Sequence, residues 1–391
     1  MPYASLVDHP LCPAELLAEA FRPIARVTMH CHSTLLFVLL WPTALPAVMP
    51  SVTLSEDGRQ FELSDRGVPF VPWGFNYDHD RDGQLLEEYW IAAWDTVASD
   101  FAEMKQLGAN IVRVHLQFGR FIESPTQVNE TNIERLRQLI ALAESTELYL
   151  DITGLGCYHK ADVPAWYDEL DEPSRWRAQA TFWAAVAEAC ASSPAIFCYD
   201  LMNEPVVPGG TQKQDHWLGP AFGDKHFVQF ITRERRGRER SAIARQWIRT
   251  LVAAIRKYDR RHLITVGLVP WSLDRPGLTS GFIPSTIAPE LDFIAVHMYP
   301  QTKQLSDSLE TLRAFRSAGK LVVIEEMFPL RCSASELGEF IEQSRGAANG
   351  WIGFYWGVTP DEYRELPSTI PHAMTLAWLD LFAQRSKATG E

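Results

Sequence analysis

The segment AIFCYDLMNEPVV, Ala195 to Val207, joins an apolar run to a polar ending. The run is typical of a buried strand, and it finishes on Asn203, Glu204 and Pro205, where the proline prevents further strand pairing. Burying an unpaired carboxylate is costly, so packing alone gives no reason for Glu204 at this position. A catalytic role does give one, and the remaining strand-like runs of the chain test that interpretation.

Seven other short apolar runs occur in the chain, and longer segments of helical pattern separate them. The runs are FVPWGFNY (70–77), NIVRVHLQF (110–118), LYLDITG (148–154), LITVGLVPW (263–271), DFIAVHMYP (292–300), LVVIEEMF (321–328) and WIGFYWG (351–357). The helical segments are 94–108, 131–146, 175–192 and 241–259, and the first places Val97, Phe101 and Met104 on one face before it ends on a glycine.

Eight strands alternating with helices predict parallel strands joined by crossover helices, because consecutive parallel strands need such connections. The expected fold class is therefore α/β, a (β/α)8 TIM barrel. An open doubly wound sheet is the alternative, and the absence of a GxGxxG motif after the first run weighs against it. Turn signals at Asp57-Gly58 and Arg66-Gly67 add a small N-terminal β-hairpin ahead of the barrel. We assign residues 1–51 to an N-terminal segment and 52–391 to the barrel.

The N-terminal segment contains the apolar run TLLFVLLWPTALPAV (34–48), which is too short for a stable membrane span. Arg22 and Arg26 precede the run and small residues follow it, which is the layout of a secretory signal, although one that starts far from Met1. Translation from Met29 would give a signal-like segment of about 29–48. We expect a secreted or periplasmic protein, or a cytoplasmic one if the segment is instead a peripheral packing element.

The composition narrows the range of partners. The chain has 36 Lys and Arg against 49 Asp and Glu, a net charge of −13, which argues against nucleic acid because that role needs clustered basic residues. Its six cysteines form no CxxC motif or Cys/His cluster with metal spacing, so we expect no metal and no cofactor. Thirteen tryptophans are compatible with a sugar-binding cleft, whose flat aromatic faces cover sugar rings. We expect a monomer.

Polar residues gather at the ends of the predicted strands, where the active site of a TIM barrel forms. Arg113 and His115 lie two apart in the second run, and His297 and Tyr299 lie two apart at the end of the sixth. Glu325 and Glu326 end the seventh run, and Trp356 lies near the end of the eighth. Together with Asn203 and Glu204 on the fourth, these residues form a constellation at one end of the barrel.

This constellation resembles the retaining glycoside hydrolases of clan A, and family 5, with its endoglucanases and β-mannanases, is the nearest match. The resemblance covers about residues 70–360 and rests on NEP, HMY, the glutamate of the seventh strand and the tryptophan of the eighth. It implies that Glu204 is the acid/base and Glu326 the nucleophile. It also implies a set of substrate-binding residues, which are Arg113, Asn203, His297, Tyr299 and Trp356. The sequence departs from the family at Thr153, where a histidine is frequent, and at Met327 and Phe328 after the nucleophile.

The resemblance implies hydrolysis of a β-linked oligosaccharide or polysaccharide (a glucan, mannan or related glycan) by double displacement. One carboxylic acid protonates the leaving oxygen while a carboxylate on the other face attacks the anomeric carbon, which requires the two groups to lie ~5–5.5 Å apart. Two alternatives remain, a catalytically silent carbohydrate-binding barrel and a transglycosylase that uses the same residues.

Two structural expectations follow from these assignments. Adjacent strand residues point to opposite faces, so Asn203 and Glu204 can share the cleft only if their strand is bulged or curled at its end. The long connection from Val206 to about Arg240 is expected to wall off one side of the cleft, which would make the cleft shorter than an open groove.

Overall fold

The computed structural model describes residues 49–275 and 279–389. The predicted signal-like segment lies outside the described residues. Among the helices described, none is long and apolar enough to cross a membrane.

Eight parallel strands close into a barrel in chain order, as predicted from the alternation of apolar runs and helical segments. The barrel strands are β4 (Trp73–Tyr77), β5 (Ile111–Gln117), β8 (Tyr149–Gly156), β9 (Ile196–Asn203), β12 (Leu263–Leu268), β13 (Ile294–His297), β14 (Val322–Glu326) and β15 (Gly350–Phe354). Each pairs with the next through the parallel registers expected of crossover connections, and β15 pairs with β4 to close the ring. The fold is a (β/α)8 barrel.

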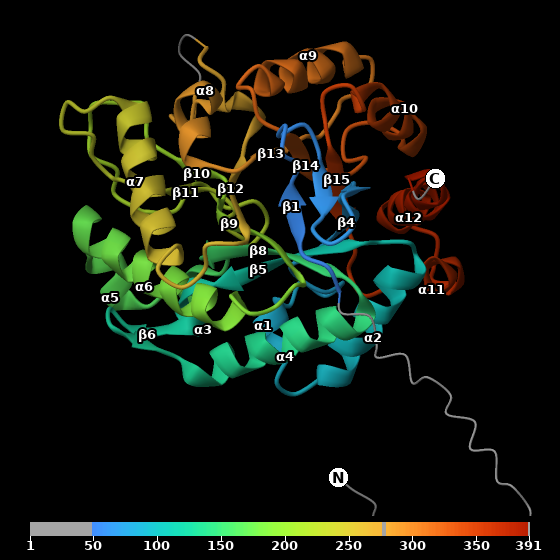
Figure 1. Cartoon of the computed structure of the whole chain (residues 1–391), viewed down its shortest axis with the longest axis horizontal. Coiled ribbons are helices and arrows are strands. Elements are labelled where there is room, and N and C mark those ends of the chain that lie inside the picture. The colour runs from blue at the N-terminus through green and yellow to red at the C-terminus, as the bar shows by residue number, and fades with distance from the viewer. Residues whose placement is uncertain (1–48, 276–278, 390–391) are drawn as a thin grey trace, which may run out of the picture. The chain divides into compact units, whose positions relative to one another are not determined.

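Helices surround the barrel on its outer side (Figure 1). The longer ones are α2 (Trp94–Gln106), α4 (Glu130–Thr146), α6 (Glu172–Cys190), α7 (Arg240–Ile255), α9 (Leu305–Arg316), α10 (Ala334–Ser344) and α12 (Ile370–Thr389). Shorter elements lie in the connections: α1 (Leu86–Tyr89), α3 (Phe118–Phe121), α5 (Ala165–Glu169), α8 (Pro284–Ile287), α11 (Pro360–Glu365), and the two-stranded pairs β6 (Ile122–Ser124) with β7 (Gln127–Val128) and β10 (Pro205–Val206) with β11 (Gln229–Phe230).

The helix boundaries follow from capping residues in the sequence. The Asn129 side chain accepts a hydrogen bond from the backbone of Asn132 at the start of α4, and Asp171 does the same for Ser174 at the start of α6. Helix α2 ends before Gly108, whose φ of +94° lies in the left-handed region that favours glycine at helix ends.

A three-stranded antiparallel sheet precedes the barrel, formed by β1 (Val52–Leu54), β2 (Phe61–Leu63) and β3 (Val68–Phe70). Its strands meet at the two turns predicted from the sequence. The Phe61 ring packs edge-on against Phe197 at 5.1 Å and Phe293 at 5.3 Å, both from the barrel floor, and Phe70 packs against Tyr149 at 4.8 Å. The sheet thus seals the end of the barrel at which the strands begin, and leaves the other end for the site.

The interior of the barrel changes character along its axis. Apolar side chains such as Ile111 and Val323 belong to the sealed floor, whereas Arg113 and Glu325, two residues further along the same strands, are charged and fully buried. Because inward-facing residues alternate along each strand, a layer of buried charge lies directly beneath the open mouth.

Candidate active site

Glu204 and Glu326 meet at the mouth of the barrel, although they come from β9 and β14. An oxygen of each carboxylate and a ring nitrogen of His297 all lie within 4.8 Å of one another. His297 Nδ1 is 2.9 Å from Glu204 Oε1 and 3.3 Å from Glu326 Oε2, so the imidazole bridges the two carboxyl groups. Carboxyl groups about 5 Å apart suit direct attack on an anomeric carbon, whereas an intervening water molecule needs a wider gap.

A distortion of β9 turns both Asn203 and Glu204 into the cleft, which confirms the predicted irregularity. Along the pairing with β12, Asp200 is opposite Thr265 but Asn203 is opposite Gly267, so β9 carries one additional residue. Glu204 itself has a φ of +46°, which is uncommon for a residue with a side chain and ends the strand.

Strand β14 has a second distortion, at the other glutamate. Its register against β13 shifts between Val296 and His297, so that His297 lies opposite Glu326. As a result Glu325 and Glu326 both point inward, at different depths. Glu325 is fully buried in the barrel, while Glu326 retains 8% exposure at the mouth, where a substrate can reach it.

Arg113 is the cation beneath the site, and it is fully buried. Its guanidinium donates to Glu326 Oε1 at 2.8 Å, Asn76 Oδ1 at 2.9 Å, Asp200 Oδ2 at 2.7 Å and Asn203 Oδ1 at 3.1 Å. Burial alone would lower the pKa of Arg113, but the neighbouring carboxylates raise it well above its usual value. The guanidinium therefore remains charged and is the counterion beneath Glu326.

Tyr299 and Trp356 complete the predicted set. The Tyr299 hydroxyl donates to Glu326 Oε2 at 2.7 Å, and burial together with Glu326 raises the pKa of this phenol well above its ordinary value. Trp356 stacks on Phe354 with a centroid separation of 5.5 Å, and its buried indole nitrogen has no hydrogen-bond partner. An indole with a free N–H suits contact with a sugar, whose ring covers the aromatic face and whose hydroxyl accepts the N–H.

Residues 71–336 match the family described as Cellulase (glycosyl hydrolase family 5), which is more than half of the chain. The chain belongs to glycoside hydrolase family 5. A curated relative, the mannan endo-1,4-beta-mannosidase A of Podospora anserina, is 24% identical over 61% of this chain and 64% of its own length.

Solved structures share the family 5 barrel. The exo-beta-1,4-mannosidase from Opitutaceae bacterium strain TAV5 superposes with a TM-score of 0.63 at 18% identity, over 86% of this chain and 62% of its own. The endo-1,4-beta-mannanase from Rhizomucor miehei gives 0.56 at 18% identity, over 85% of this chain and 99% of its own. The present chain thus spans less than two thirds of the Podospora and Opitutaceae proteins.

Several polar residues around this family 5 site were not singled out from the sequence as site residues. Asp200 accepts from Thr153 Oγ1 at 2.8 Å and from the Gly267 amide at 2.7 Å, so Thr153, where the family often has histidine, positions the main counterion of Arg113. His115 contacts the Tyr158 hydroxyl and Asn76 Oδ1. Burial and Arg113 lower the pKa of His115 well below its usual range, so its imidazole is neutral. Asn76 could have been predicted from the sequence, because strand alternation puts its side chain on the inward face of β4.

Asp151 and Glu325 form a second acidic pair, deeper in the barrel. Both are fully buried. Burial raises the pKa of Asp151 to about 7, and burial with the carboxylates of Asp151 and Asp200 raises the pKa of Glu325 well above its ordinary value. One cation cannot balance several ionised carboxylates in a low-dielectric interior, so this pair keeps its protons to a higher pH than free carboxyl groups do.

Three groups in the described part of the chain bring together side chains that could ligate a metal ion, and Glu204, His297 and Glu326 at the mouth of the barrel form one of them. Another is Asp151, Cys198 and Glu325 in the barrel interior. The third is Glu88, His159 and Asp162, but the Arg120 guanidinium already lies 3.5 Å from Glu88 and 3.2 Å from Asp162. Arginine therefore supplies the positive charge at that last group.

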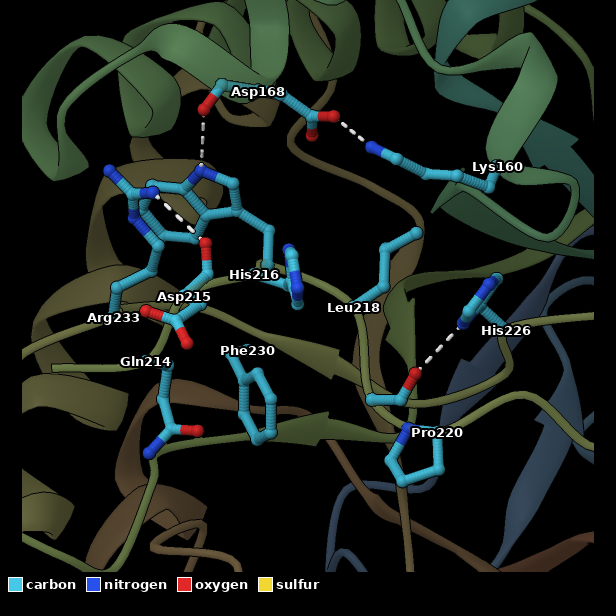
Figure 2. A pocket seen from close by; sticks show the side chains of 12 residues that line it. Lys160, Asp168, Gln214, Asp215, His216, Leu218, Pro220, His226, Phe230 and Arg233 are labelled. Atoms are coloured by element: carbon cyan, nitrogen blue, oxygen red, sulfur yellow. Dashed lines mark hydrogen bonds and ion pairs between the residues drawn. The ribbon is translucent and has the colours of Figure 1, made fainter.

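A cavity of about 680 Å³ lies beside the site and is lined by other residues (Figure 2). Figure 2 shows Lys160 paired with Asp168 on one side, and His216 and Phe230 on the connection that follows β9. The lining of this cavity includes neither Glu204 nor Glu326. We therefore assign the site from the convergence of the carboxylates rather than from the size of the hollow.

Proposed function

We propose that this protein is a retaining β-glycosidase that hydrolyses a β-linked glycan by double displacement. The observation that carries the proposal is the approach of Glu204 and Glu326 within 4.8 Å at the mouth of the barrel. The environment of the two differs, which suits two different roles. Glu326 accepts hydrogen bonds from both Arg113 and Tyr299, as an anionic nucleophile requires. Among the described side chains, the Glu204 carboxyl group has a hydrogen bond only with the ring of His297.

In the first step Glu326 attacks the anomeric carbon while Glu204 donates its proton to the departing glycosidic oxygen. A glycosyl-enzyme ester on Glu326 results, in which one oxygen is bonded to the sugar and the other, the carbonyl oxygen, retains its own donor, either Arg113 on Oε1 or Tyr299 on Oε2. In the second step Glu204, now a carboxylate, takes a proton from water, which attacks the same carbon and restores Glu326. The sugar therefore leaves with the configuration it had in the substrate.

Asn203 has the position to bind the 2-hydroxyl of the cleaved sugar. Its Oδ1 accepts from Arg113 at 3.1 Å and its Nδ2 donates to the Phe227 carbonyl at 3.1 Å, so the amide plane is fixed on both sides. A fixed dipole near the reacting carbon can strengthen its contact as oxocarbenium character develops, without reorganisation. Trp356 would support the ring of the same sugar.

We propose β-1,4-linked mannosides as the substrate class. The support is the activity named for the Podospora relative, a mannan endo-1,4-beta-mannosidase, whose match covers 61% of this chain. Glucosides are the second class, because the matching family is named for cellulase.

The proposal is tested with 4-nitrophenyl β-D-mannopyranoside and β-D-glucopyranoside, and with β-1,4-mannooligosaccharides. We expect hydrolysis of the mannosides. Glu204→Gln removes general acid–base catalysis and should lower kcat about 10²–10⁴-fold on the oligosaccharides. Glu326→Gln removes the nucleophile and should abolish turnover of both substrate types. Glu239 is an exposed glutamate in the connection between β9 and α7, and Glu239→Gln is the control, which should retain full activity.

The two alternatives give different results. Binding of the oligosaccharides without hydrolysis by the unmodified protein would show a silent carbohydrate-binding barrel and would refute the proposal. Predominant transfer to an added acceptor sugar, with both glutamates still required, would show a transglycosylase and would refute hydrolysis as the function.

A further inference from the structure

The connection between β9 and α7 contains a hairpin, residues 218–229, which we call the Lys225 hairpin. Leu218 pairs with Gln229 and Phe222 with Lys225 in antiparallel bridges. The Gly219 amide donates to the Val228 carbonyl at 2.8 Å, and the Phe222 amide donates to the Lys225 carbonyl at 2.9 Å. Gly223 at the tip has a φ of +64°, which lets the chain reverse there.

The base of the Lys225 hairpin is attached to the catalytic residues. Asn203 donates to the Phe227 carbonyl at 3.1 Å, and the Gln229 amide donates to the Glu204 carbonyl at 3.4 Å. The His226 amide donates to the Tyr158 carbonyl at 2.9 Å, and the Phe227 ring packs on Tyr158 at 5.0 Å. His226 Nδ1 also lies 2.8 Å from the Gly219 carbonyl, as Figure 2 shows, so its ring clamps the two strands of the hairpin together.

The tip of the hairpin reaches the loop that follows β4, on the far side of β8 and β5. The Lys225 ammonium lies 3.2 Å from the point where a side chain on Gly83 would begin, and Gly83 has a φ of +86°. Asp224, next to Lys225 in the hairpin, has a carboxylate oxygen 3.7 Å from His159 Nε2. Beyond the tip, the ring of His79 lies 6.3 Å from that of Trp356. The hairpin, His79 and Trp356 therefore form a continuous wall from the end of β9 round to the end of β15.

Two side chains with a buried polar atom that lacks a good hydrogen bond, Asp78 and His79, lie at this wall. Asp78 directly follows β4 and is 2% exposed. Burial alone would raise the pKa of Asp78, but the neighbouring His79 lowers it below its ordinary value, so the carboxylate is ionised. Its Oδ1 lies 2.9 Å from His79 Nδ1, yet neither atom has a hydrogen bond of good geometry. Buried polar atoms without partners are rare in native proteins and indicate a ligand that supplies the missing bonds.

The chemistry of the catalytic pair fixes which end of a substrate meets this wall. The acid Glu204 must touch the glycosidic oxygen, so the leaving group lies on the Glu204 side of the cleaved sugar. With its 2-hydroxyl at Asn203 and its ring on Trp356, the sugar would extend from the anomeric carbon towards the ends of β15 and β4, because the ring of Trp356 lies 6.3 Å from that of His79. The non-reducing end of this sugar therefore faces Asp78, and the wall lies beyond that end.

We propose that the Lys225 hairpin closes the cleft one sugar beyond the cleavage point, so that the enzyme removes single residues from the non-reducing end, and that Asp78 and Lys225 bind the free hydroxyls of that terminal sugar. The inference rests on the proposed glycosidase function. A terminal sugar carries a hydroxyl that can donate to Asp78. An internal sugar carries a glycosidic oxygen with no proton there, and would leave Asp78 without that hydrogen bond. A site built around such a hydrogen bond rejects the analogue that lacks it.

The products from β-1,4-mannopentaose labelled at its reducing end test the inference. We expect mannose from the first minutes, a labelled ladder that shortens by one residue at a time, and no fall in the viscosity of a mannan solution. Early mannobiose or mannotriose, with falling viscosity, would overturn the inference and leave the glycosidase function intact. No hydrolysis of any mannoside or glucoside would instead refute the proposed function itself.

Variants separate the wall from the catalytic groups. Lys225→Ala, and a chain in which a two-residue turn replaces residues 221–226 and keeps Phe227, should raise hydrolysis of 4-nitrophenyl β-mannobioside (with release of the disaccharide) relative to the monosaccharide glycoside, by about tenfold or more. Lys213→Ala, an exposed lysine on the same connection, should leave this ratio unchanged. A cooperative unfolding transition in urea, at a midpoint close to that of the unmodified protein, shows that a variant is folded. An unchanged ratio in Lys225→Ala and in the shortened chain would contradict the closing role of the hairpin.

Asp78→Asn tests recognition of the terminal hydroxyl. We expect kcat/KM for 4-nitrophenyl β-D-mannopyranoside to fall about 10- to 100-fold, mainly through KM, because a hydrogen bond to a charged partner is lost. Asp82→Asn, an exposed aspartate in the same loop, is the matched control and should behave as the unmodified protein. Equal kinetics for both variants would contradict the role of Asp78.

Discussion

The Arg113 guanidinium connects its own strand to residues from three other strands of the barrel. It contacts Asn76 of β4, Asp200 and Asn203 of β9 and Glu326 of β14, and it belongs to β5. Such a buried cation costs much desolvation free energy, which the surrounding carboxylates offset only if every partner stays in place. The same contacts that hold the nucleophile thus also hold the barrel.

We expect Arg113→Met to destabilise the protein by about 3–5 kcal/mol, because Asp200 and Glu326 would remain buried without a counterion. The free energy of unfolding is measured by urea denaturation. Arg137→Met, whose ion pair with Glu134 at 3.2 Å lies on the surface, should change stability by no more than about 1 kcal/mol. Similar losses in the two variants would contradict the role of Arg113 as central counterion.

The Asp151–Glu325 pair makes stability depend on pH. Burial raises the pKa of Asp151 to about 7, whereas the pKa of an aspartate in the unfolded chain is near 4. Between pH 4 and pH 7 the native state therefore binds more protons than the unfolded state. Stability from this pair is therefore present at low pH and is lost as pH rises through that window. In Asp151→Asn we expect a smaller loss of unfolding free energy between pH 5 and pH 8 than in the unmodified protein.

Denaturation at the two pH values measures the difference, with Asp82→Asn as an exposed control that should keep the original pH dependence. An Asp151→Asn protein with an unaltered pH dependence would show that the pair does not hold extra protons.

The sequence predicted the site residues that end strands, and missed those that lie beside them. Four of these residues directly follow apolar runs, so their positions at strand ends could be predicted from the pattern alone: Asn203, Glu204, His297 and Glu326. Asp200 lies inside a run, where its inward direction depends on the register and the bulge of β9. Other residues, such as Asp78 and Tyr158, lie beyond the strand ends, where alternation no longer predicts direction.

At the scale of elements, the two strands that carry the glutamates are both irregular. The distortion of β9 was predictable because Asn203 and Glu204 are adjacent and were both assigned to the cleft. The shift in β14 was not predicted, because only one of Glu325 and Glu326 was expected to act. Because of this shift, Glu325 lies inside the barrel beside Arg113 and Glu326 lies at the mouth.

The N-terminal sheet is the element that closes the floor of the barrel. We expect Phe61→Ala to cost about 3–5 kcal/mol, because the ring is 1% exposed and packs on Phe197 and Phe293, while kcat on an aryl glycoside stays unchanged because the site is at the other end.

Urea denaturation and initial rates at a temperature where both proteins are folded measure these two quantities. Val68→Ala in the same sheet, at an exposed position, is the control and should cost less than about 1 kcal/mol. A stability loss in Phe61→Ala no larger than that of the control would show that the sheet is not part of the packed core.

At the scale of the whole molecule, the barrel was predictable and the shape of its mouth was not. Eight apolar runs separated by helical patterns leave few topologies, and the family match over residues 71–336 falls within the region where the resemblance was found. The path of the Lys225 hairpin depends on contacts with Tyr158 and Gly83, which are distant in sequence. The expectation that this connection borders the cleft agrees with its bonds to Asn203 and Glu204, but only the folded chain gives the residues that form the wall.

The central claim is that two carboxyl groups from opposite sides of the barrel act on one anomeric carbon without a water molecule between them. Proton NMR of the sugar released from 4-nitrophenyl β-D-mannopyranoside in the first minutes, before mutarotation, tests it most directly. Double displacement through Glu326 predicts that the β-anomer appears first and the α-anomer only later. Appearance of the α-anomer first would mean single displacement by water and would contradict the account.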